Sequence, residues 1–353
     1  MRDAIPVVFD METQDPDDFL TLLLLLGHPA VDLRAVTITP GSRWQVGLIR
    51  KALEWFAVTI PVGARKLDHP KECVSHWHRK AYGAFEPSSD AEPAVDVLRR
   101  LCDETTTLIT GAPVHNLGAA CASTDFRLGR WVAQGGFAGH GVVPPELQLP
   151  KFAGRRTMAT FNLGGAPKAA LAALAHPGIR ERRFVSKNVC HRVVYDETLH
   201  QQIGALVEES LALARIWQGM ETYLQRRRHH SRNEAIDAPH VLLVGDGEKR
   251  EASIADALAR AEELDHDLVD VGAPTEVPVC RLVPKTASSE PVGKKLHDPL
   301  AACCAIDPTV GTWAEVELFR EKGKWGSRLA PGSGCEILID YDHDAFVQVF
   351  TAR

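Results

Sequence analysis

The stretch VVFDMETQDPDDFLTLLLLLGHP, residues 7–29, carries the strongest structural signal in the chain. An apolar strand runs into five acids and continues as an apolar helix; the acids are Asp10, Glu12, Asp15, Asp17 and Asp18. Carboxylates this close repel one another, and burying them is costly unless a cation neutralises them. A hard cation such as Ca²⁺ accepts about six to eight oxygen ligands and suits such a cluster. The alternative is a solvated turn in which Asp17 or Asp18 caps the helix.

The segments that follow alternate between strand and helix patterns. Residues 31–39 (VDLRAVTIT) predict a strand, residues 45–56 a helix, and residues 60–64 (IPVGA) another strand. This alternation is typical of a parallel sheet with crossover helices, so we predict an α/β fold: a mostly parallel open sheet flanked by helices. In such sheets ligands bind beyond the carboxyl ends of the strands, where the acids and Ser42 would gather.

Length and composition narrow the function further. The 353 residues leave room for one large α/β domain and a smaller unit. A net charge of −6 argues against non-specific binding of nucleic acid. Apolar stretches stay short of about 18 residues, so no membrane span is predicted. The first strand begins without a signal-peptide pattern, and the eight cysteines lack zinc-site spacing. We therefore expect a cytoplasmic protein with reduced thiols.

The acidic stretch resembles the N-terminal signature D-x-D-P-G-x-D-D of the inosine–uridine nucleoside hydrolases. Asp10 and Glu12 stand at the first two acids, and Asp17 and Asp18 at the last pair. Glu12 replaces an aspartate and the interval between the pairs is one residue longer, so either Glu12 or Asp15 takes the place of the second aspartate. The resemblance implies a Ca²⁺ site that includes Asp10, Glu12 and Asp18. It also implies a general base, Glu12 or Asp15, and a ribose ligand, Asp17.

A second motif lies near the other end of the chain. LHDPLAACCAIDP, residues 296–308, resembles the same family's H-D-P-L-A-x-x-x-A-I-D-P segment almost letter for letter. The resemblance implies that Asp298 is the distant calcium ligand and that His297 gives a proton to the leaving base. His-Asp-Pro is also an ordinary helix start, with Asp298 as the N-cap. Its occurrence together with the acid cluster favours the site.

Two shorter segments resemble further parts of that site. In GAPVHN, residues 111–116, the resemblance implies that the backbone carbonyl of His115 joins the calcium ligands. In MATFNLGG, residues 158–165, Asn162 matches an asparagine that holds the ribose. Thr160 stands where the family has a glutamate for the sugar 5′-hydroxyl, which suggests a substrate altered or extended at the 5′ position.

The other substrate contacts implied by the resemblance are Ser42, His78 and Tyr223. Ser42 replaces a sugar-binding asparagine. His78 falls within residues 68–93, a stretch that we expect to form a loop, where the family has a base-facing histidine. Tyr223 belongs to a helical pattern over residues 197–225, which in the family forms a wall beside the base. Each has a plainer interpretation, because loop histidines are usually solvated and apolar helical residues usually pack in the core. Asn162, before Gly-Gly, equally suits a turn.

Residues 232–284 follow a pattern of their own: a strand with a GDG turn, a capped helix and a strand pair. This segment resembles the N-terminal domain of bacterial translation initiation factor three. The matching motifs follow one another in the same order: R-N-E-x-I-x-A-P, GDG, S-I-x-x-A-L-x-x-A, D-L-V-x-V and EVPVCRLV. Five Lys or Arg face twelve Asp or Glu here, and a negative module is repelled by phosphates. A lid or an oligomer contact is therefore favoured over an RNA or ribosome contact.

These patterns together predict a nucleoside hydrolase-like domain of residues 1–228 and 290–353, with a small α+β domain of residues 229–289 inserted. The resemblance implies Ca²⁺-dependent hydrolysis of the N-glycosidic bond of a ribonucleoside or related ribosyl compound, in a homo-oligomer, either dimer or tetramer. The alternative is an inactive hydrolase scaffold that acts as a ribosome- or RNA-associated regulator. Glu12, Ser42 and Thr160 support that alternative, whereas the retained acid cluster opposes it, because a dead site has no reason to keep costly buried charge.

Overall fold

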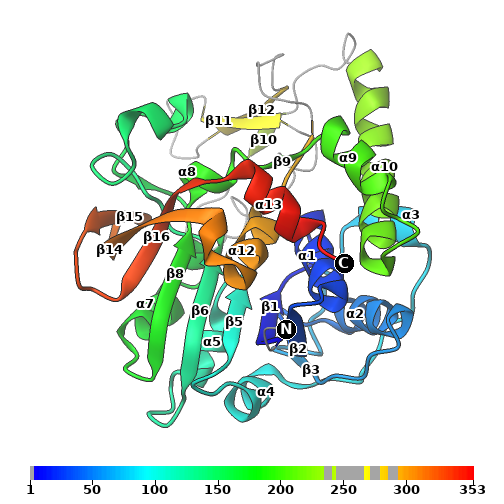
Figure 1. Ribbon diagram of the computed structural model, residues 1–353, viewed down its shortest axis with the longest axis horizontal. Helices are drawn as coiled ribbons and strands as arrows, with labels where there is room; N and C mark the ends of the chain where they lie inside the picture. The colour runs from blue at the N-terminus through cyan, green and yellow to red at the C-terminus, as the bar shows by residue number, and fades with distance from the viewer. Residues whose placement is uncertain (1–3, 234–240, 244–265, 271–278, 285–292) are drawn as a thin grey trace. The chain divides into compact units, whose positions relative to one another are not determined.

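The computed structural model describes residues 4–233, 241–243, 266–270, 279–284 and 293–353 (Figure 1). Within them lies one large sheet of eleven strands, in the order β4-β3-β2-β1-β5-β6-β8-β16-β14-β15-β7. All neighbours from β4 to β16 run parallel, and β14, β15 and β7 continue the sheet antiparallel. The predicted mostly parallel α/β fold is therefore confirmed.

The strands are β1 (Ile5–Met11), β2 (Val31–Ile38), β3 (Val62–Ala64), β4 (Glu92–Pro93), β5 (Thr107–Thr110), β6 (Leu128–Gln134), β7 (Thr157–Met158), β8 (Ile179–Val185), β14 (Gly311–Glu321), β15 (Lys324–Leu329) and β16 (Cys335–Tyr341). The helices around them are α1 (Pro16–Gly27), α2 (Arg43–Trp55), α3 (His76–Tyr82), α4 (Ala94–Leu101), α5 (His115–Ala120), α6 (Phe161–Gly165), α7 (Pro167–Ala175), α8 (Lys187–Cys190), α9 (Glu197–Gly204), α10 (Leu211–Asn233), α12 (His297–Ile306) and α13 (His343–Phe350).

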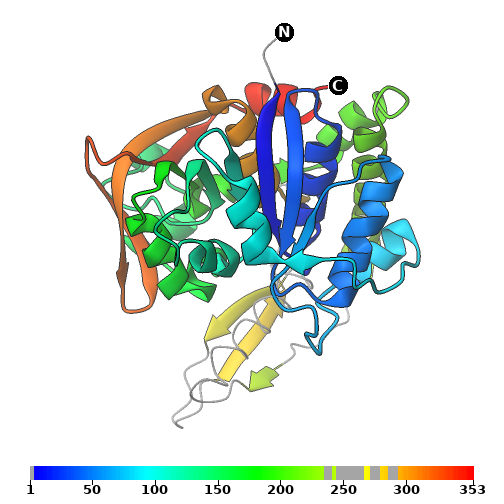
Figure 2. The same ribbon diagram turned by 90° about the horizontal axis from the view of Figure 1, so that it is seen from below.

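The chain reverses its direction across the sheet at β1. From β1 it proceeds to β2, β3 and β4 on one side, and then returns to build β5, β6 and β8 on the other side. Because crossovers between parallel strands are right-handed, the two series place their helices on opposite faces, and Figure 2 shows helices on both sides of these strands. The carboxyl ends of β1 and β5 thus form a topological switch point, where ligands bind in open α/β sheets.

The strand before the acids is fully buried. Val7, Val8 and Phe9 are 0% exposed, as expected for a central strand covered on both faces. The following helix α1 buries every residue from Asp17 to Leu25, which explains why its sequence is apolar all round. It packs against α12, from near the other end of the chain. This packing brings the two predicted motifs together.

Two predicted elements differ from the structure. Residues 68–93 were expected to form a loop, but they contain α3, whose Trp77 and Tyr82 are buried among aromatic rings. The single helix expected over residues 197–225 is two helices, because α9 ends at Gly204 and the Ser210 hydroxyl accepts a hydrogen bond from Leu213 N at the start of α10. The apolar residues keep helical spacing across the break, so the sequence pattern did not predict it.

Contacts within the chain separate residues 223–292 from the unit formed by residues 1–222 and 293–353. In the smaller unit, β10 (Val241–Leu243), β12 (Val279–Pro284) and β11 (His266–Asp270) form an antiparallel sheet in that order. Most of the predicted translation-factor-like fold lies outside the described residues. No helix in the described segments is both long and apolar enough to cross a membrane.

Candidate active site

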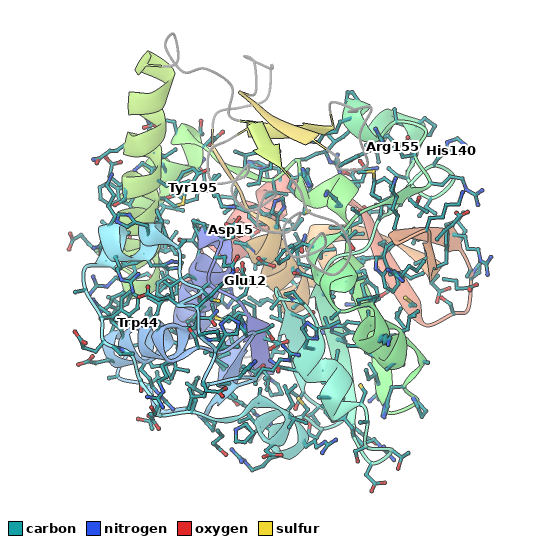
Figure 3. The ribbon with its side chains drawn as sticks, turned by 180° about the vertical axis from the view of Figure 1, so that it is seen from behind. Glu12, Asp15, Trp44, His140, Arg155 and Tyr195 are labelled. Atoms are coloured by element: carbon teal, nitrogen blue, oxygen red, sulfur yellow. The ribbon has the colours of Figure 1, made fainter. Side chains whose placement is uncertain are left out.

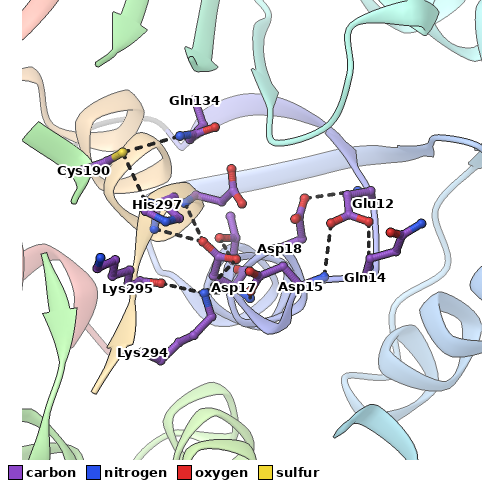
Figure 4. Close-up of polar contacts among 12 residues, drawn as sticks. Glu12, Gln14, Asp15, Asp17, Asp18, Gln134, Cys190, Lys294, Lys295 and His297 are labelled. Atoms are coloured by element: carbon purple, nitrogen blue, oxygen red, sulfur yellow. Dashed lines mark hydrogen bonds and ion pairs between the residues drawn. The ribbon is translucent and has the colours of Figure 1, made fainter. Parts of the chain in front are cut away.

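The acidic stretch turns from β1 into α1 at the switch point, and the N-terminus of α12 meets it there. Figure 3 places Glu12 and Asp15 at this turn, and Figure 4 shows the contacts around it. Asp15 is the N-cap of α1, with its Oδ1 accepting a hydrogen bond from Asp17 N at 3.2 Å. Asp17 Oδ2 in turn accepts hydrogen bonds from the backbone N–H groups of His297 (2.9 Å) and Asp298 (3.2 Å). Asp17 therefore caps α12 and fastens the two motifs to each other.

Three buried carboxylates converge beside this cap. One oxygen each from Asp17, Asp18 and Asp298 lie within 4.8 Å of one another, which is a spacing that suits a shared cation. Asp298 Oδ1 is buried and has no hydrogen-bond partner within the described part of the chain. Because a buried oxygen without a partner is costly, this arrangement fits a bound metal ion better than a purely structural cluster.

Asp10 lies at the end of β1, held from both sides. Its Oδ1 accepts hydrogen bonds from Thr37 Oγ1 and Asn116 Nδ2, both at 2.7 Å, and Asn116 also bonds Thr39 Oγ1. Its Oδ2 is buried and, among the described residues, has no hydrogen-bond partner. These contacts fix the carboxylate while leaving one oxygen available, as a metal ligand requires.

Burial shifts the acids of this site toward their neutral forms. It raises the pKa of Asp10 from 3.8 to about 7 and that of Glu12 from 4.5 to about 8, the latter with help from the nearby charges of Asp15 and Asp17. Burial and the charge of Asp298 raise the pKa of Asp18 well above 3.8. Burial and the charges of Asp17 and Asp15 raise the pKa of Asp298 in the same way. A divalent cation would restore the ionised forms, so the donor set fits a hard metal such as Ca²⁺.

The two candidate general bases are held differently. Glu12 accepts hydrogen bonds from the N–H groups of Gln14 (2.6 Å) and Asp15 (3.2 Å), while its own N–H donates to Asp18 Oδ1. Asp15 is half-buried and forms an ion pair with Lys294 Nζ at 2.7 Å. Burial and the charge of Asp17 raise the pKa of Asp15 to about 6. A carboxylate that is partly exposed and titrates near neutrality suits proton transfer from water.

Lys294 places an ammonium group inside the acid cluster. Its Nζ lies 2.7 Å from Asp15 Oδ1 and 3.5 Å from Asp17 Oδ1, and only 7% of the residue is exposed. It sits on β13 (Lys294–Lys295), which pairs with β9 (Val194–Tyr195) ahead of α12. The sequence analysis missed this residue, although it stands three positions before the His-Asp-Pro motif.

A chain of side-chain contacts leads from His297 to Asn162. His297 Nδ1 lies 3.1 Å from Cys190 Sγ, and Gln134 Nε2 donates to the same sulfur at 3.5 Å. Asn162 Nδ2 donates to Gln134 Oε1 at 2.7 Å and to its carbonyl at 3.0 Å. Burial lowers the pKa of His297 to about 3, so its ring is neutral near neutral pH. His191, whose ring centroid is 5.0 Å from that of His297, lies beside this chain.

The other predicted contacts lie as follows. Ser42 caps α2 in a capping box with Gln45 and donates to the carbonyl of Glu72. His78 is fully buried on α3, with its Nδ1 at 3.1 Å from Ser75 Oγ, and its Nε2 has no hydrogen-bond partner in the described structure. His115 begins α5 directly after the turn that follows β5. Tyr223 lies on α10 in the smaller unit. The roles of all four remain predictions.

Sequence reasoning missed Asn116, Gln134, Cys190 and Lys294. Asn116 is the last residue of the GAPVHN segment, so its motif was found but its own bond to Asp10 was not. Gln134 ends β6, and a polar residue at the carboxyl end of a parallel strand is a usable signal. Cys190 carries no comparable signal, because its neighbours come from distant segments.

The carboxylate cluster depends on the absence of a side chain at Gly111, which follows β5. A Cβ there would lie 2.6 Å from Asp18 Oδ1 and 2.8 Å from Asp298 Oδ1. We predict that Gly111→Ala pushes these carboxylates apart and weakens Ca²⁺ binding at least about tenfold, as measured by calorimetry. Gly164→Ala is the control, since a Cβ there meets nothing within 4 Å. Equal affinities for the two variants would contradict this account.

The raised pKa values predict how stability changes with pH when the metal is removed. A carboxyl whose pKa is higher in the folded chain binds more protons there, so the free energy of unfolding falls as the pH rises through that range. For Asp10 and Glu12 the range runs from about 4 to about 8. We expect the melting temperature in chelator to fall across it.

Added Ca²⁺ should remove most of that fall, since the cation stabilises the ionised acids. Asp10→Asn should reduce the fall in chelator, because the amide cannot ionise. A melting temperature that rises with pH in chelator would refute the assignment of buried, destabilising acids.

Comparison with known proteins agrees with this geometry. Residues 7–348 match the family model of the inosine-uridine preferring nucleoside hydrolases. No curated protein sequence matches the chain. Among solved structures, a plant nucleoside hydrolase has a TM-score of 0.60 at 15% identity, covering 98% of this chain and 97% of its own. The inosine-uridine preferring nucleoside hydrolase of Bacillus anthracis has a TM-score of 0.58 at 15% identity, covering 98% of both chains.

An inosine-guanosine nucleoside hydrolase is also similar, with a TM-score of 0.55 at 15% identity over 98% of this chain and 97% of that one. At this identity the structures establish the fold, whereas the family model covers nearly the whole chain and identifies the family. The expectation of a nucleoside N-ribohydrolase is confirmed: the chain belongs to the inosine-uridine preferring nucleoside hydrolase family.

Proposed function

We propose that this protein hydrolyses the N-glycosidic bond of a ribonucleoside or related ribosyl compound in a Ca²⁺-dependent reaction, giving a free base and the sugar. The observation that carries the proposal is the convergence of Asp17, Asp18 and Asp298, brought from opposite ends of the chain to one buried point. The family is metal-dependent, and the unpartnered oxygens of Asp10 and Asp298 suit an ion there. The inactive-scaffold alternative is not favoured by family membership.

Asp10, Glu12, Asp18, Asp298 and the carbonyl of His115 are the proposed metal ligands. Bound Ca²⁺ would orient the ribose diol and make a water molecule more acidic. Glu12 or Asp15 accepts the proton of the attacking water as general base. The ion pair with Lys294 stabilises the charged form of Asp15, which keeps this carboxylate ready to accept that proton.

The other proposed contacts grip the sugar and the base. Asp17 and Asn162 bind ribose hydroxyls, and Ser42, His78 and Tyr223 complete the substrate-binding set. Cleavage of the bond leaves positive charge on the sugar ring, which the surrounding carboxylates stabilise. His297, or another group of the pocket, protonates or polarises the departing base. The contact of His297 with Cys190 at Nδ1 orients the ring and leaves the opposite nitrogen for this task.

The metal requirement has a direct test. We predict that EDTA abolishes base release from inosine or uridine and that CaCl₂ restores it. Asp18→Ala should lose both Ca²⁺ binding and activity, because Asp18 is a buried member of the cluster. Asp32→Ala is the matched control, since Asp32 is exposed on β2 and forms an ion pair with Arg34. Full activity after chelation would overturn the proposal.

A second experiment identifies the base. The neutral variants Glu12→Gln and Asp15→Asn keep the size of each side chain. We expect the variant of the true base to lose on the order of 10²–10⁴-fold in kcat. Asp15→Asn should leave the Ca²⁺ affinity near that of the unaltered protein, whereas Glu12→Gln should weaken it, because Glu12 is also a proposed metal ligand. The geometry favours Asp15, because it is half-buried and titrates at about 6. If both variants keep full kcat, neither carboxylate is the base.

A homo-oligomer, either a dimer or a tetramer, remains a prediction, and an RNA or ribosome contact through the insertion remains the alternative that is not favoured. Sedimentation equilibrium would measure the first, and co-sedimentation with small ribosomal subunits the second. The negative charge of residues 232–284 leads us to expect no ribosome binding at physiological salt.

A further inference from the structure

A second polar cluster lies beyond the carboxyl ends of β6 and β8. Three of its side chains are at least nine-tenths buried: Thr160 is 7% exposed, Asn162 2% and Ser186 0%. Each has a polar atom without a hydrogen-bond partner in the described structure, namely Thr160 Oγ1, Asn162 Oδ1 and Ser186 Oγ. A single such atom is common, but three in one region are costly and indicate a missing ligand.

The backbone brings these three residues together. Ser186 directly follows β8, whose Val185 pairs with Gln134 at the end of β6. Asn162 donates to both the carbonyl and the side chain of Gln134. Lys187 Nζ donates to the carbonyl of Ala159, directly before Thr160, at 3.3 Å. Lys187, which directly follows Ser186, therefore places its ammonium group at the residue next to Thr160.

The cluster is joined to the acid site by short contacts. From Asn162 the chain of contacts passes through Gln134 and Cys190 to His297, whose backbone N–H binds Asp17. A ribosyl compound that presents its diol to the acids has two other substituents, the base and the 5′ group. Nucleobases are neutral near neutral pH, whereas a 5′ substituent is the usual place for a permanent negative charge. The ammonium and the two hydroxyls match such an anion.

We propose that the substrate carries a phosphate monoester on its 5′ carbon, held by Lys187 with the hydroxyls of Thr160 and Ser186. This inference rests on the proposed hydrolysis. The reaction is otherwise unchanged: the C1′–N bond breaks, water oxygen bonds to C1′, and a proton passes to the base. The products are the free base and ribose 5-phosphate. Thr160 also fits a substrate with a 5′-phosphate, because a carboxylate at that position would repel the phosphate.

The experiment compares base release from inosine and uridine with base release from their 5′-monophosphates. We expect kcat/KM to be at least about tenfold higher for the monophosphates, because a hydrogen bond from the ammonium group to the charged phosphate strengthens binding by about this factor. Lys187→Gln should lower the ratio of monophosphate to nucleoside kcat/KM about tenfold or more. Lys168→Gln is the control, since Lys168 is exposed on α7, and should leave the ratio unchanged. Thr160→Glu should invert the preference.

The outcomes separate this inference from the proposed function. If nucleosides are hydrolysed and the monophosphates are not preferred, the inference fails and the function stands. If no base is released from any of the four compounds, the function fails. In that event calorimetry with ribose 5-phosphate against ribose tests the cluster by itself, and equal affinities overturn it. Should Thr160→Glu not fold, the Lys187→Gln ratio still decides.

Discussion

The burial of several carboxylates at one point is the constraint on which this structure depends. Asp10, Asp17, Asp18 and Asp298 are each at most 4% exposed, and such charges are tolerated only where other groups stabilise them. The N-terminus of α12 provides two N–H groups to Asp17, Lys294 provides an ammonium, and Gly111 provides the space. The remaining negative charge calls for a cation. The packing of α1 on α12 brings Asp298 next to Asp17 and Asp18.

Much of this arrangement was predictable, because its main parts are local in sequence. The acids share one turn of ten residues or so, and a strand followed by a buried helix places that turn at the sheet edge. The strand–helix alternation likewise predicted the parallel sheet. Linking Asp298 to the turn needed more than local pattern, since it lies near the other end of the chain. Only the resemblance of its motif connected it.

The features that were not predicted depend on contacts between distant segments, and such contacts produce no periodic pattern in the sequence. Lys294 reaches Asp15 because β13 pairs with β9, and a two-residue strand is too short to show alternation. Cys190 and Gln134 meet through the pairing of β6 with β8 and the short helix α8. The break between α9 and α10 was hidden for a related reason: a short turn kept the apolar residues in helical register.

The negative and positive groups of the site lie at opposite ends of it. Carboxylates gather at the ends of β1 and α1, whereas Lys187 and the buried hydroxyls gather beyond β6 and β8, with His297 and Cys190 between them. A ligand with hydroxyls at one end and an anion at the other can bind in only one orientation, since the reversed one would set the anion against the carboxylates. The electrostatic field of the site, rather than its shape alone, would therefore present C1′ to the proposed general base.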